Sequence, residues 1–266
     1  MAIAENHGKL SDTGSEDLLT ADVFGAFRYL PAREGIIGFL RSLGGAAQAI
    51  PEPDDSAECV IHFWPLGLLC RREPDVLLEL QVGGQLYHVA VEAKYYAGPG
   101  DREDDEVEYR GEVLRMGNQL GDESHDLSHG RYQVYRGAWR GPELALSSPP
   151  QHRLLLYLTA HIFPPEGELG RAVAYDPTLR GRLFWGSWYD VYSYLESVRE
   201  SLDRFPYNRV LDDVLVLLRK KRFSLFEGIT LPAGLAVGEG TGGFWRWFAA
   251  PPDLPADRVS GAFWRA

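Results

Sequence analysis

The sequence predicts an α/β fold in which helices flank a mixed central sheet. Three observations support this prediction: an apolar helical pattern over residues 15–29, two strand-like runs joined by Gly83-Gly84, and an alternation of strands and helices further along the chain. This order favours a layered architecture, with helices packed on the faces of a sheet. With 266 residues and 45% hydrophobic side chains, the chain is long enough for one substantial core.

The first helix is expected over residues 15–29. Leu19, Val23 and Phe27 recur four residues apart on one face, and Pro31 stops the pattern. Recurrence at this interval places apolar side chains along one stripe, which a helix buries against the rest of its domain.

The segment Thr13-Gly14-Ser15-Glu16 at the start of this helix matches a capping box, in which the glutamate binds back to the helix start. Glu16 therefore has an ordinary structural role open to it. A second, shorter helix is expected over residues 34–43, and a strand rich in β-branched and aromatic residues over residues 59–64.

Two further strand-like runs, residues 75–82 and 85–93, are separated by Gly83-Gly84, which favours a two-residue hairpin turn. In such a hairpin the numbers of paired residues have a constant sum. Without a bulge, Asp75 therefore lies directly opposite Glu92, with Cβ atoms roughly 4.5–5.5 Å apart.

Lys94 projects from the same face as Glu92, because side chains two residues apart on a strand share a face. Two carboxylates held side by side repel each other unless a cation or a shared proton relieves the charge. Mg²⁺ or Mn²⁺ could do so, bound by Asp75, Glu92 and the Ala93 carbonyl, since Mg²⁺ prefers oxygen ligands. Lys94 could then orient the attacking water, help it lose a proton, or neutralise charge in the transition state.

The alternative interpretation of these residues is a solvated salt-bridge cluster on an exposed strand face. Leu77 and Ala90 belong to the same face, so this face is not uniformly polar. On the opposite face, Val89, Val91 and Ala93 suit a hydrophobic core. These neighbours favour a functional site over a solvated cluster.

Beyond the hairpin, a helix is expected over residues 107–120, because Val113, Met116 and Leu120 share one face of the pattern. A continuous apolar run over residues 152–159 is typical of a strand buried on both sides. A further strand and two helices are expected over residues 182–185, 187–202 and 208–221.

Glu73-Pro74-Asp75, followed by Glu92-Ala93-Lys94 at the close of the hairpin, resembles the PD-(D/E)xK signature of the restriction-endonuclease-like superfamily. The resemblance implies a restriction-endonuclease-like mixed central sheet flanked by helices, and Mg²⁺-dependent hydrolysis of phosphodiester bonds. It also implies an acidic residue on the helix before the hairpin, and Glu16 occupies that place as a further catalytic residue and metal ligand. Many related members carry a glutamine on the helix after the lysine strand, which Gln119 matches. The ordinary alternative for Gln119 is an amide on a helix surface.

The downstream pattern is also similar to uncharacterised bacterial members of this superfamily, through Trp185, Ser187-Trp188-Tyr189-Asp190 and Phe226-Glu227-Gly228. The C-terminal part carries many aromatic side chains, among them Trp245 and Trp264, which could pack on the domain or form a protein interface. We therefore expect a flexible tail, a nuclease-like domain, and a C-terminal extension rich in Gly, Pro and aromatic residues, over residues 1–14, 15–230 and 231–266.

The formal net charge of −11 opposes unaided binding to a polyanion, because phosphate contacts need clustered Lys and Arg. The acids are concentrated in residues 101–108, however, and Arg219-Lys220-Lys221-Arg222 forms a basic run. This run could interact favourably with the negative C-terminal end of a helix dipole, or it could contact a phosphate backbone. Nucleic acid, DNA before RNA, is the expected partner, and a protein partner or a second copy of the chain could supply further basic surface.

Features of secreted and membrane proteins are missing from the sequence. No run of about 18 apolar residues occurs, and the first fifteen residues lack the apolar stretch of a signal peptide. The two cysteines, Cys59 and Cys70, cannot build a disulfide framework or a four-thiolate zinc site. A cytoplasmic protein without membrane contact is therefore expected.

Other candidate sites are weaker. His125 and His129, four residues apart in an acidic stretch, could ligate a metal from one helical face, but a solvated loop is the preferred interpretation. No nucleophile elbow surrounds the serines of this stretch, and no phosphate loop occurs, which argues against a serine hydrolase and a nucleotide hydrolase. The acids around the two histidines are Asp122, Glu123 and Asp126.

The sequence thus predicts a metal-dependent nuclease that hydrolyses phosphodiester bonds in DNA, within a prokaryotic antiviral defence or DNA-processing system. The expected metal ligands are Asp75, Glu92, Ala93 and Glu16. A different class of function stays open: a non-catalytic assembly or regulatory subunit that retains the nuclease fold and binds other proteins. The residues expected to carry catalysis are Asp75, Glu92, Lys94, Glu16 and Gln119.

Overall fold

The chain divides into two units, Met1–Ser224 and Leu225–Ala266. The expected N-terminal tail, the C-terminal extension and Phe226-Glu227-Gly228 lie outside the residues that the structure describes. Within the described part, none of the helices has the length and apolar character that a membrane crossing requires. The structure, a computed structural model, describes residues 15–95, 105–109, 112–116, 118–136, 139–201 and 207–224.

A five-stranded sheet with the order β1-β3-β4-β9-β10 forms the centre of the first unit. Strands β1, β3 and β4 pair antiparallel, whereas β4, β9 and β10 pair parallel, so the sheet is mixed as the sequence predicts. The strands coincide with runs of β-branched, aromatic and leucine residues. Their bounds are Glu58–Phe63 (β1), Val76–Val82 (β3), Gln85–Ala93 (β4), Arg153–Thr159 (β9) and Leu183–Ser187 (β10).

The turn between β3 and β4 consists of Gly83 and Gly84, with φ angles of 56° and 74°. Both angles lie in the left-handed region, which glycine enters without the steric cost that a Cβ atom imposes. Positive φ at both positions is what a type I′ hairpin turn requires. The pairing continues away from the turn to Val76, which lies opposite Val91, and this is the register that the sequence predicts.

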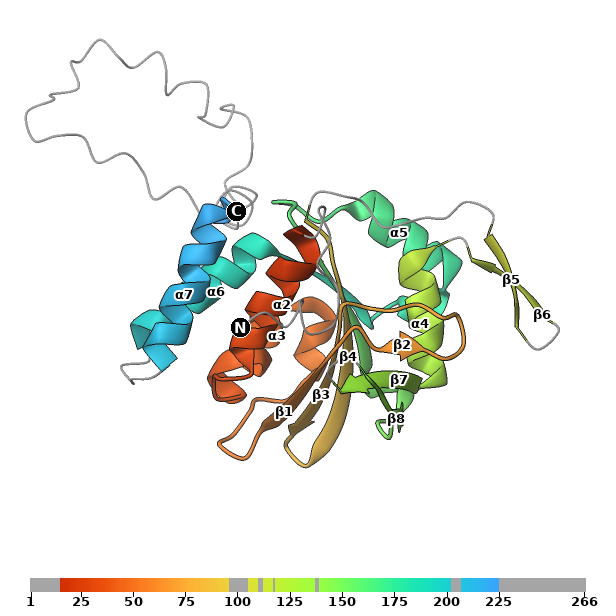
Figure 1. The fold of residues 1–266 in the computed structure, drawn as a ribbon, viewed down its shortest axis with the longest axis horizontal. Helices are drawn as coiled ribbons and strands as arrows, with labels where there is room; N and C mark the ends of the chain where they lie inside the picture. The colour runs from red at the N-terminus through yellow and green to blue at the C-terminus, as the bar shows by residue number, and fades with distance from the viewer. Residues whose placement is uncertain are drawn as a thin grey trace, which may run out of the picture. The chain divides into compact units, whose positions relative to one another are not determined.

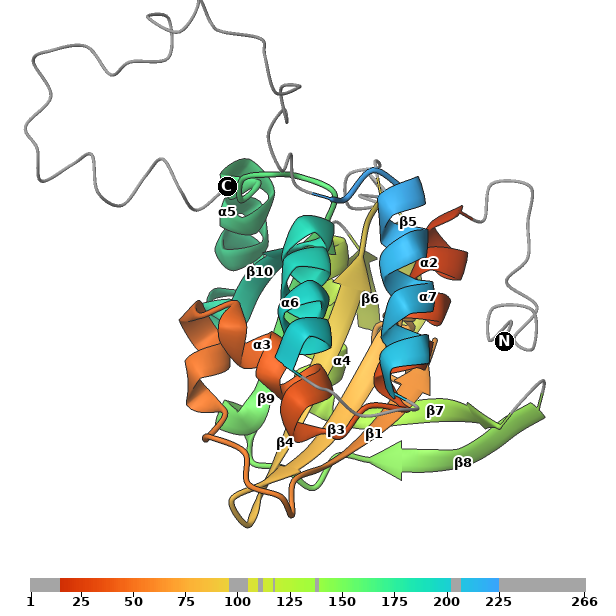
Figure 2. The ribbon, with the colours of Figure 1, turned by 90° about the vertical axis from the view of Figure 1, so that its left-hand side faces the viewer.

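Helices α2, α3, α6 and α7 cover one face of the sheet (Figures 1 and 2). Val76 and Leu78 of β3, and Val89 and Val91 of β4, join the larger hydrophobic core on this side. Alternate residues of each strand therefore point to the core, as the pleat requires. The elements on this side span Ser15–Phe27 (α2), Arg33–Ile37 (η1), Gly38–Ser42 (α3), Gly45–Ala49 (η2), Trp188–Ser201 (α6) and Tyr207–Lys220 (α7).

Helix α4 lies on the opposite face, together with α5 and a small antiparallel sheet of the order β2-β7-β8 (Figure 1). Leu77 and Ala90 point to this side and pack with Leu120 and Leu127 of α4 in a second hydrophobic cluster. The predicted acidic pair belongs to this face. The elements here span Leu66–Gly67 (β2), Gln119–His129 (α4), Arg131–Arg136 (β7), Trp139–Ala145 (β8), Pro150–His152 (η3), Glu166–Tyr175 (α5) and Pro177–Leu179 (η4).

The prediction of a helix over residues 107–120 is wrong. Strands Asp105–Tyr109 (β5) and Glu112–Met116 (β6) form an antiparallel pair there, and α4 begins only at Gln119. The run Glu106-Val107-Glu108-Tyr109 places β-formers at alternate positions. This period of two outweighs the helical spacing of the apolar residues that follow.

The stretch around His125 and His129 is helix α4, so the prediction of a solvated loop there is also wrong. The side chain of Asn118 caps the helix by accepting a hydrogen bond from the Gly121 N–H at 2.9 Å. Gly130, with a φ of 72°, ends the helix in the left-handed region. These start and stop residues are ordinary helix signals. The acidic residues between them are buried in the folded chain, and Asp122 and Asp126 bind partners that are distant in the sequence.

Candidate active site

Asp75 and Glu92 lie at the open end of the β3–β4 hairpin, one position beyond the last pair of the ladder. Both are buried, with exposed fractions of 7% and 2%. The Ala93 N–H donates a hydrogen bond to Asp75 Oδ2 at 2.8 Å, and the Trp64 N–H donates to the Asp75 carbonyl at 2.9 Å. These contacts hold the Asp75 side chain against the end of β4.

Lys94 follows β4 and places its ammonium group between two carboxylates. Its Nζ lies 2.5 Å from Glu92 Oε1 and 3.4 Å from Glu16 Oε1. The backbone of Lys94 is fixed by donation of its N–H to the Leu158 carbonyl at 2.7 Å and by donation from Trp188 Nε1 to its own carbonyl at 3.1 Å. Burial lowers the pKa of Lys94, but the surrounding carboxylates together outweigh burial and raise this pKa above its ordinary value.

Glu16 reaches the site from the first turn of α2, although it precedes Lys94 by 78 residues. Its Oε2 accepts a hydrogen bond from the Tyr95 N–H at 2.8 Å, while Oε1 faces Lys94. The carboxylate therefore ties the start of α2 to the chain just after β4. Thr13, the other half of the expected capping box, lies outside the described residues.

Gln119 is the first residue of α4, and its Nε2 donates a hydrogen bond to Glu92 Oε1 over 2.5 Å. The Asn118 cap fixes this end of the helix and thereby the position from which Gln119 reaches β4. Glu92 Oε1 consequently contacts both the Gln119 amide and the Lys94 ammonium group. Gln119 is thus part of the cluster rather than an isolated amide on a helix surface.

The electrostatics of the site favour a neutral Asp75. Its pKa is raised well above the ordinary value, first because the carboxyl group is buried and second because Glu92 lies nearby. Lys94 and the Ala93 N–H oppose this rise in pKa without cancelling it. A cation that bound here would have to displace a proton, and would in return relieve the repulsion between carboxylates.

Glu123 is a fourth carboxylate of this cluster, and the sequence did not single it out. It lies one turn after Gln119 on α4, and only 1% of it is exposed. Within the described residues, neither of its oxygens accepts a hydrogen bond. Burial, and then the neighbouring charge of Glu92, raise the pKa of Glu123 well above its ordinary value. The four-residue spacing from Gln119, which places both side chains on one helix face, is the signal that could have identified it.

Helix α4 also holds the loop that leads into β3. Asp126 accepts hydrogen bonds from the N–H groups of Leu69, Cys70 and Arg72, at 2.7, 2.9 and 3.1 Å. One turn earlier, Asp122 Oδ2 accepts from Nε and Nη2 of Arg72, at 3.0 and 2.8 Å. This loop runs directly into the start of β3, next to Asp75, while Gln119 of α4 binds Glu92 on β4. Helix α4 therefore helps to position both acids of the pair.

Lys221, from the basic run at the end of α7, contacts the residue that follows Lys94. The Lys221 Nζ lies 5.4 Å from the centre of the Tyr95 ring, and the Tyr95 hydroxyl donates to the Lys221 carbonyl at 3.4 Å. Tyr95 directly follows Lys94 in the chain. Lys220 and Arg222 are exposed. One positive charge of the run, that of Lys221, therefore lies beside the residue that follows Lys94.

A second group of possible metal ligands has its ligand atoms within 4.8 Å of one another and consists of Cys70, Asp122 and His125. Both oxygens of Asp122 are already engaged, because Arg72 binds Oδ2 and the Tyr175 hydroxyl donates to Oδ1 at 3.0 Å. Burial raises the pKa of the Cys70 thiol to about 12, which disfavours the thiolate that a metal requires. His129 does not belong to this group, and we assign it no metal.

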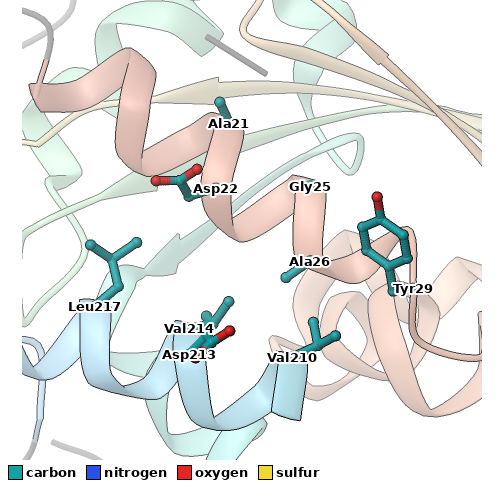
Figure 3. A pocket seen from close by; sticks show the side chains of 9 residues that line it. All are labelled: Ala21, Asp22, Gly25, Ala26, Tyr29, Val210, Asp213, Val214 and Leu217. Carbon is teal, nitrogen blue, oxygen red and sulfur yellow. The ribbon is translucent and has the colours of Figure 1, made fainter. Parts of the chain in front are cut away.

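A hollow of about 360 Å³ lies between α2 and α7 (Figure 3). Its walls are mainly alanine, valine and leucine side chains, with two carboxylates, Asp22 and Asp213. Burial raises the pKa of Asp22. The lining residues include no Lys, Arg, His, Ser or Cys, so no cation of the lining is available to stabilise an anionic substrate beside the two carboxylates. The acidic cluster is the better candidate site.

No family model, no curated protein and no solved structure matches this chain. The site is therefore interpreted from its own geometry and chemistry. Its features are four buried or half-buried carboxylates, one lysine held among them, and a glutamine that orients one of the acids.

Proposed function

We propose that this protein is a metal-dependent nuclease that hydrolyses phosphodiester bonds in DNA. The observation that best supports this function is the meeting of Asp75, Glu92 and Lys94 in one buried corner, to which α2 adds Glu16 and α4 adds Gln119. Such a cluster is costly for folding, because like charges repel and burial penalises each charge. Groups of this kind concentrate where they serve a reaction.

The donor set fits Mg²⁺ or Mn²⁺. Asp75, Glu92 and Glu16 would supply carboxylate oxygens and Ala93 its main-chain carbonyl, and hard divalent cations prefer such oxygen ligands. A bound divalent cation would stabilise the negative charge that develops on the phosphoryl oxygens.

The protein side chains would prepare the site for this charge. Lys94 holds an ammonium group beside Glu92, where it can stabilise negative charge on the transferring phosphoryl group. Gln119 orients Glu92, and Glu16 fixes the backbone at Tyr95. Because these contacts exist before substrate binds, little reorganisation is needed during the reaction.

The proposal includes a restriction-endonuclease-like domain as the finer description of the fold. Support comes from the antiparallel hairpin β3–β4 joined to the parallel strand β9, with helices on both faces of the sheet. The acidic pair lies at the end of this hairpin where β4 leaves the sheet. Open ends of parallel strands are common places for ligand binding in α/β proteins.

Lys220, Lys221 and Arg222 at the end of α7 would contact the phosphodiester backbone beside the site. The net charge of −11 still opposes binding to a polyanion. We therefore propose that a protein partner or a second copy of the chain supplies additional basic surface. In a prokaryotic cell, such an enzyme would act in antiviral defence or DNA processing.

The test is cleavage of supercoiled plasmid by the purified full-length chain, with Mg²⁺ or Mn²⁺ and with excess EDTA. We expect nicked or linear products only with metal, and a loss of at least about 100-fold in rate for Asp75→Asn. Asp212→Asn is the matched control, because Asp212 is exposed on α7 and pairs with Arg199.

Cleavage that persists at the wild-type rate in Asp75→Asn would overturn the assignment of this site. Absence of cleavage of plasmid and of single-stranded DNA with both metals would instead favour the non-catalytic subunit that the sequence left open.

A further inference from the structure

Glu123 has no ligand role in the function proposed above, although it is buried among the proposed metal ligands. It is 1% exposed, and both of its oxygens lack a hydrogen-bond donor among the described residues. Buried carboxylates in folded proteins nearly always have hydrogen-bond donors or bind cations, because an unpaired buried charge is strongly destabilising. This side chain therefore requires a partner.

Among the described residues, the Glu92 carboxyl group lies within hydrogen-bonding reach of Glu123, but no side chain supplies a donor to either Glu123 oxygen. Gln119, on the same helix face as Glu123, directs its amide to Glu92. The side-chain neighbour of Glu123 is the Glu92 carboxyl group, which has no hydrogen to donate when it is ionised. The ammonium group of Lys94 contacts Glu92 and Glu16. A cation between Glu92 and Glu123 would satisfy the oxygens that these residues leave without a donor.

The formal charges of the cluster lead to the same conclusion. Once cations have displaced the protons that the raised pKa values of Asp75 and Glu123 favour, Glu16, Asp75, Glu92 and Glu123 carry four negative charges. Lys94 carries one positive charge, so the net charge of the ligand set is −3. One divalent cation reduces this to −1, which would still repel a phosphodiester anion. Two divalent cations change it to +1, which a single phosphodiester group neutralises.

We propose that Glu123 and Glu92 bind a second divalent cation, and that Glu92 bridges it to the cation held by Asp75. This inference rests on the proposed function, since it assumes that the Asp75 side of the cluster binds a metal. Two cations on one phosphate can stabilise the attacking and the leaving oxygen together. Gln119 then has a definite task, because it fixes the carboxylate that both cations share.

A proton shared between Glu92 and Glu123 is the competing way to relieve their repulsion. The two possibilities differ in the number of metal ions that the chain binds. A shared proton leaves one cation in the cluster, whereas the second site gives two. A Glu123→Gln variant separates them further, because its amide can donate a hydrogen bond to Glu92 but binds a divalent cation poorly.

The experiment is the stoichiometry of Mn²⁺ binding to the full-length chain, measured by isothermal titration calorimetry and by the loss of the free Mn²⁺ signal in electron paramagnetic resonance. We expect two ions for the wild type and one for both Glu123→Gln and Glu123→Ala. Glu196→Gln, the same substitution at a partly exposed acid on α6, should retain two ions. Circular dichroism melting curves establish that each variant is folded. The use of two substitutions at position 123 ensures that the result does not depend on one particular replacement side chain.

Each other outcome overturns the inference in a distinct way. One ion in both the wild type and Glu123→Gln would remove the second site and leave the proposed function intact. Two ions in both would show that Glu123 is not a ligand. No Mn²⁺ bound by the folded wild type would overturn the second site and the metal-dependent function together.

Discussion

The side-chain amide of Gln119 donates a hydrogen bond to Oε1 of Glu92 over 2.5 Å, and this contact joins the start of α4 to the end of β4. The same oxygen lies 2.5 Å from the Lys94 ammonium group. Glu92 is thereby held from two directions. Its carboxylate can point only where α4 and the chain after β4 allow, which makes the cluster depend on the packing of a distant helix.

Replacement of Gln119 by Ala should impair cleavage through positioning rather than through binding. Without the amide, Glu92 can adopt other rotamers, and a misplaced ligand lowers the rate of the chemical step. We expect kcat to fall roughly tenfold while KM stays within about twofold. Gln48→Ala, at an exposed amide that binds the Arg41 carbonyl, should leave both unchanged. A KM effect without a kcat effect would contradict the positioning role.

Lys94→Met should abolish cleavage while the protein remains folded. Methionine keeps much of the apolar stem of lysine but removes the charge that faces Glu92 and Glu16. We expect a loss of at least about 100-fold in single-turnover rate, because a preorganised charge in a buried site makes a large contribution to transition-state stabilisation. Arg171→Met, which removes the charge of an exposed arginine on α5, is the control. A rate within about twofold of wild type would exclude Lys94 from the chemistry.

Divalent cations should stabilise the folded chain against urea. Binding to the native state at a concentration 100 times Kd adds about 2.7 kcal/mol to the free energy of unfolding. Because the pKa of Asp75 is raised, the cation has to displace a proton, and the stabilisation should increase as pH rises. Asp75→Asn should lose this response and Asp212→Asn should keep it. Equal stabilisation of both variants would place the cation elsewhere.

Asp126→Ala should destabilise the protein by about 2–4 kcal/mol, measured by urea unfolding. The substitution leaves three N–H groups of the loop before β3 without the carboxylate that they bind, and lost hydrogen bonds to a buried charged group are costly. Asp126→Asn should cost less, because an amide oxygen still accepts. Asp55→Ala, at a carboxylate that is 95% exposed, should change stability little. Similar losses for Asp126→Ala and Asp55→Ala would contradict this role.

Glu79 should make stability depend on pH in the acid range. Its carboxylate binds His62 at 2.6 Å and His88 at 3.4 Å, and these hydrogen bonds, that from His62 first, lower the pKa of Glu79 to about 2. A lowered pKa stabilises the fold above the ordinary value of 4.5, and this contribution is lost as pH falls through about 2. After allowance for partial exposure, Glu79→Gln should cost roughly 2 kcal/mol at pH 6.

The same comparison at low pH provides the control for Glu79. The difference in unfolding free energy between the wild type and Glu79→Gln should shrink steadily below pH 4.5. A difference that stays constant down to pH 2.5 would show that the carboxylate charge is not its source.

Local sequence signals predicted the sheet around the site well. Gly83-Gly84 can adopt the positive φ angles of a tight hairpin turn, and a two-residue turn at this place is sufficient to predict the register of β3 and β4. The continuous apolar run in β9 likewise indicated a strand buried on both sides. These elements are predictable because their signals are contained within a few neighbouring residues.

Prediction failed where two local patterns competed or where burial came from distant segments. Residues 107–120 carry a helical spacing of apolar residues as well as an alternation of β-formers, and the strand pair β5–β6 prevailed. The acidic stretch after Gln119 resembled a solvated loop because its charges are balanced by partners about 50 residues away, such as Arg72. Glu123 was overlooked for the same reason, since nothing nearby in the chain shows that it faces Glu92.

The sequence by itself determined that Asp75, Glu92 and Lys94 lie at one end of a hairpin, because strand pleating and a two-residue turn fix relative positions over a short stretch of chain. Only the tertiary structure decided that Glu16 from α2 and Gln119 and Glu123 from α4 meet them there. Those contacts depend on how helices pack on the two faces of the sheet, and packing is set by buried side chains from the whole domain rather than by any local pattern.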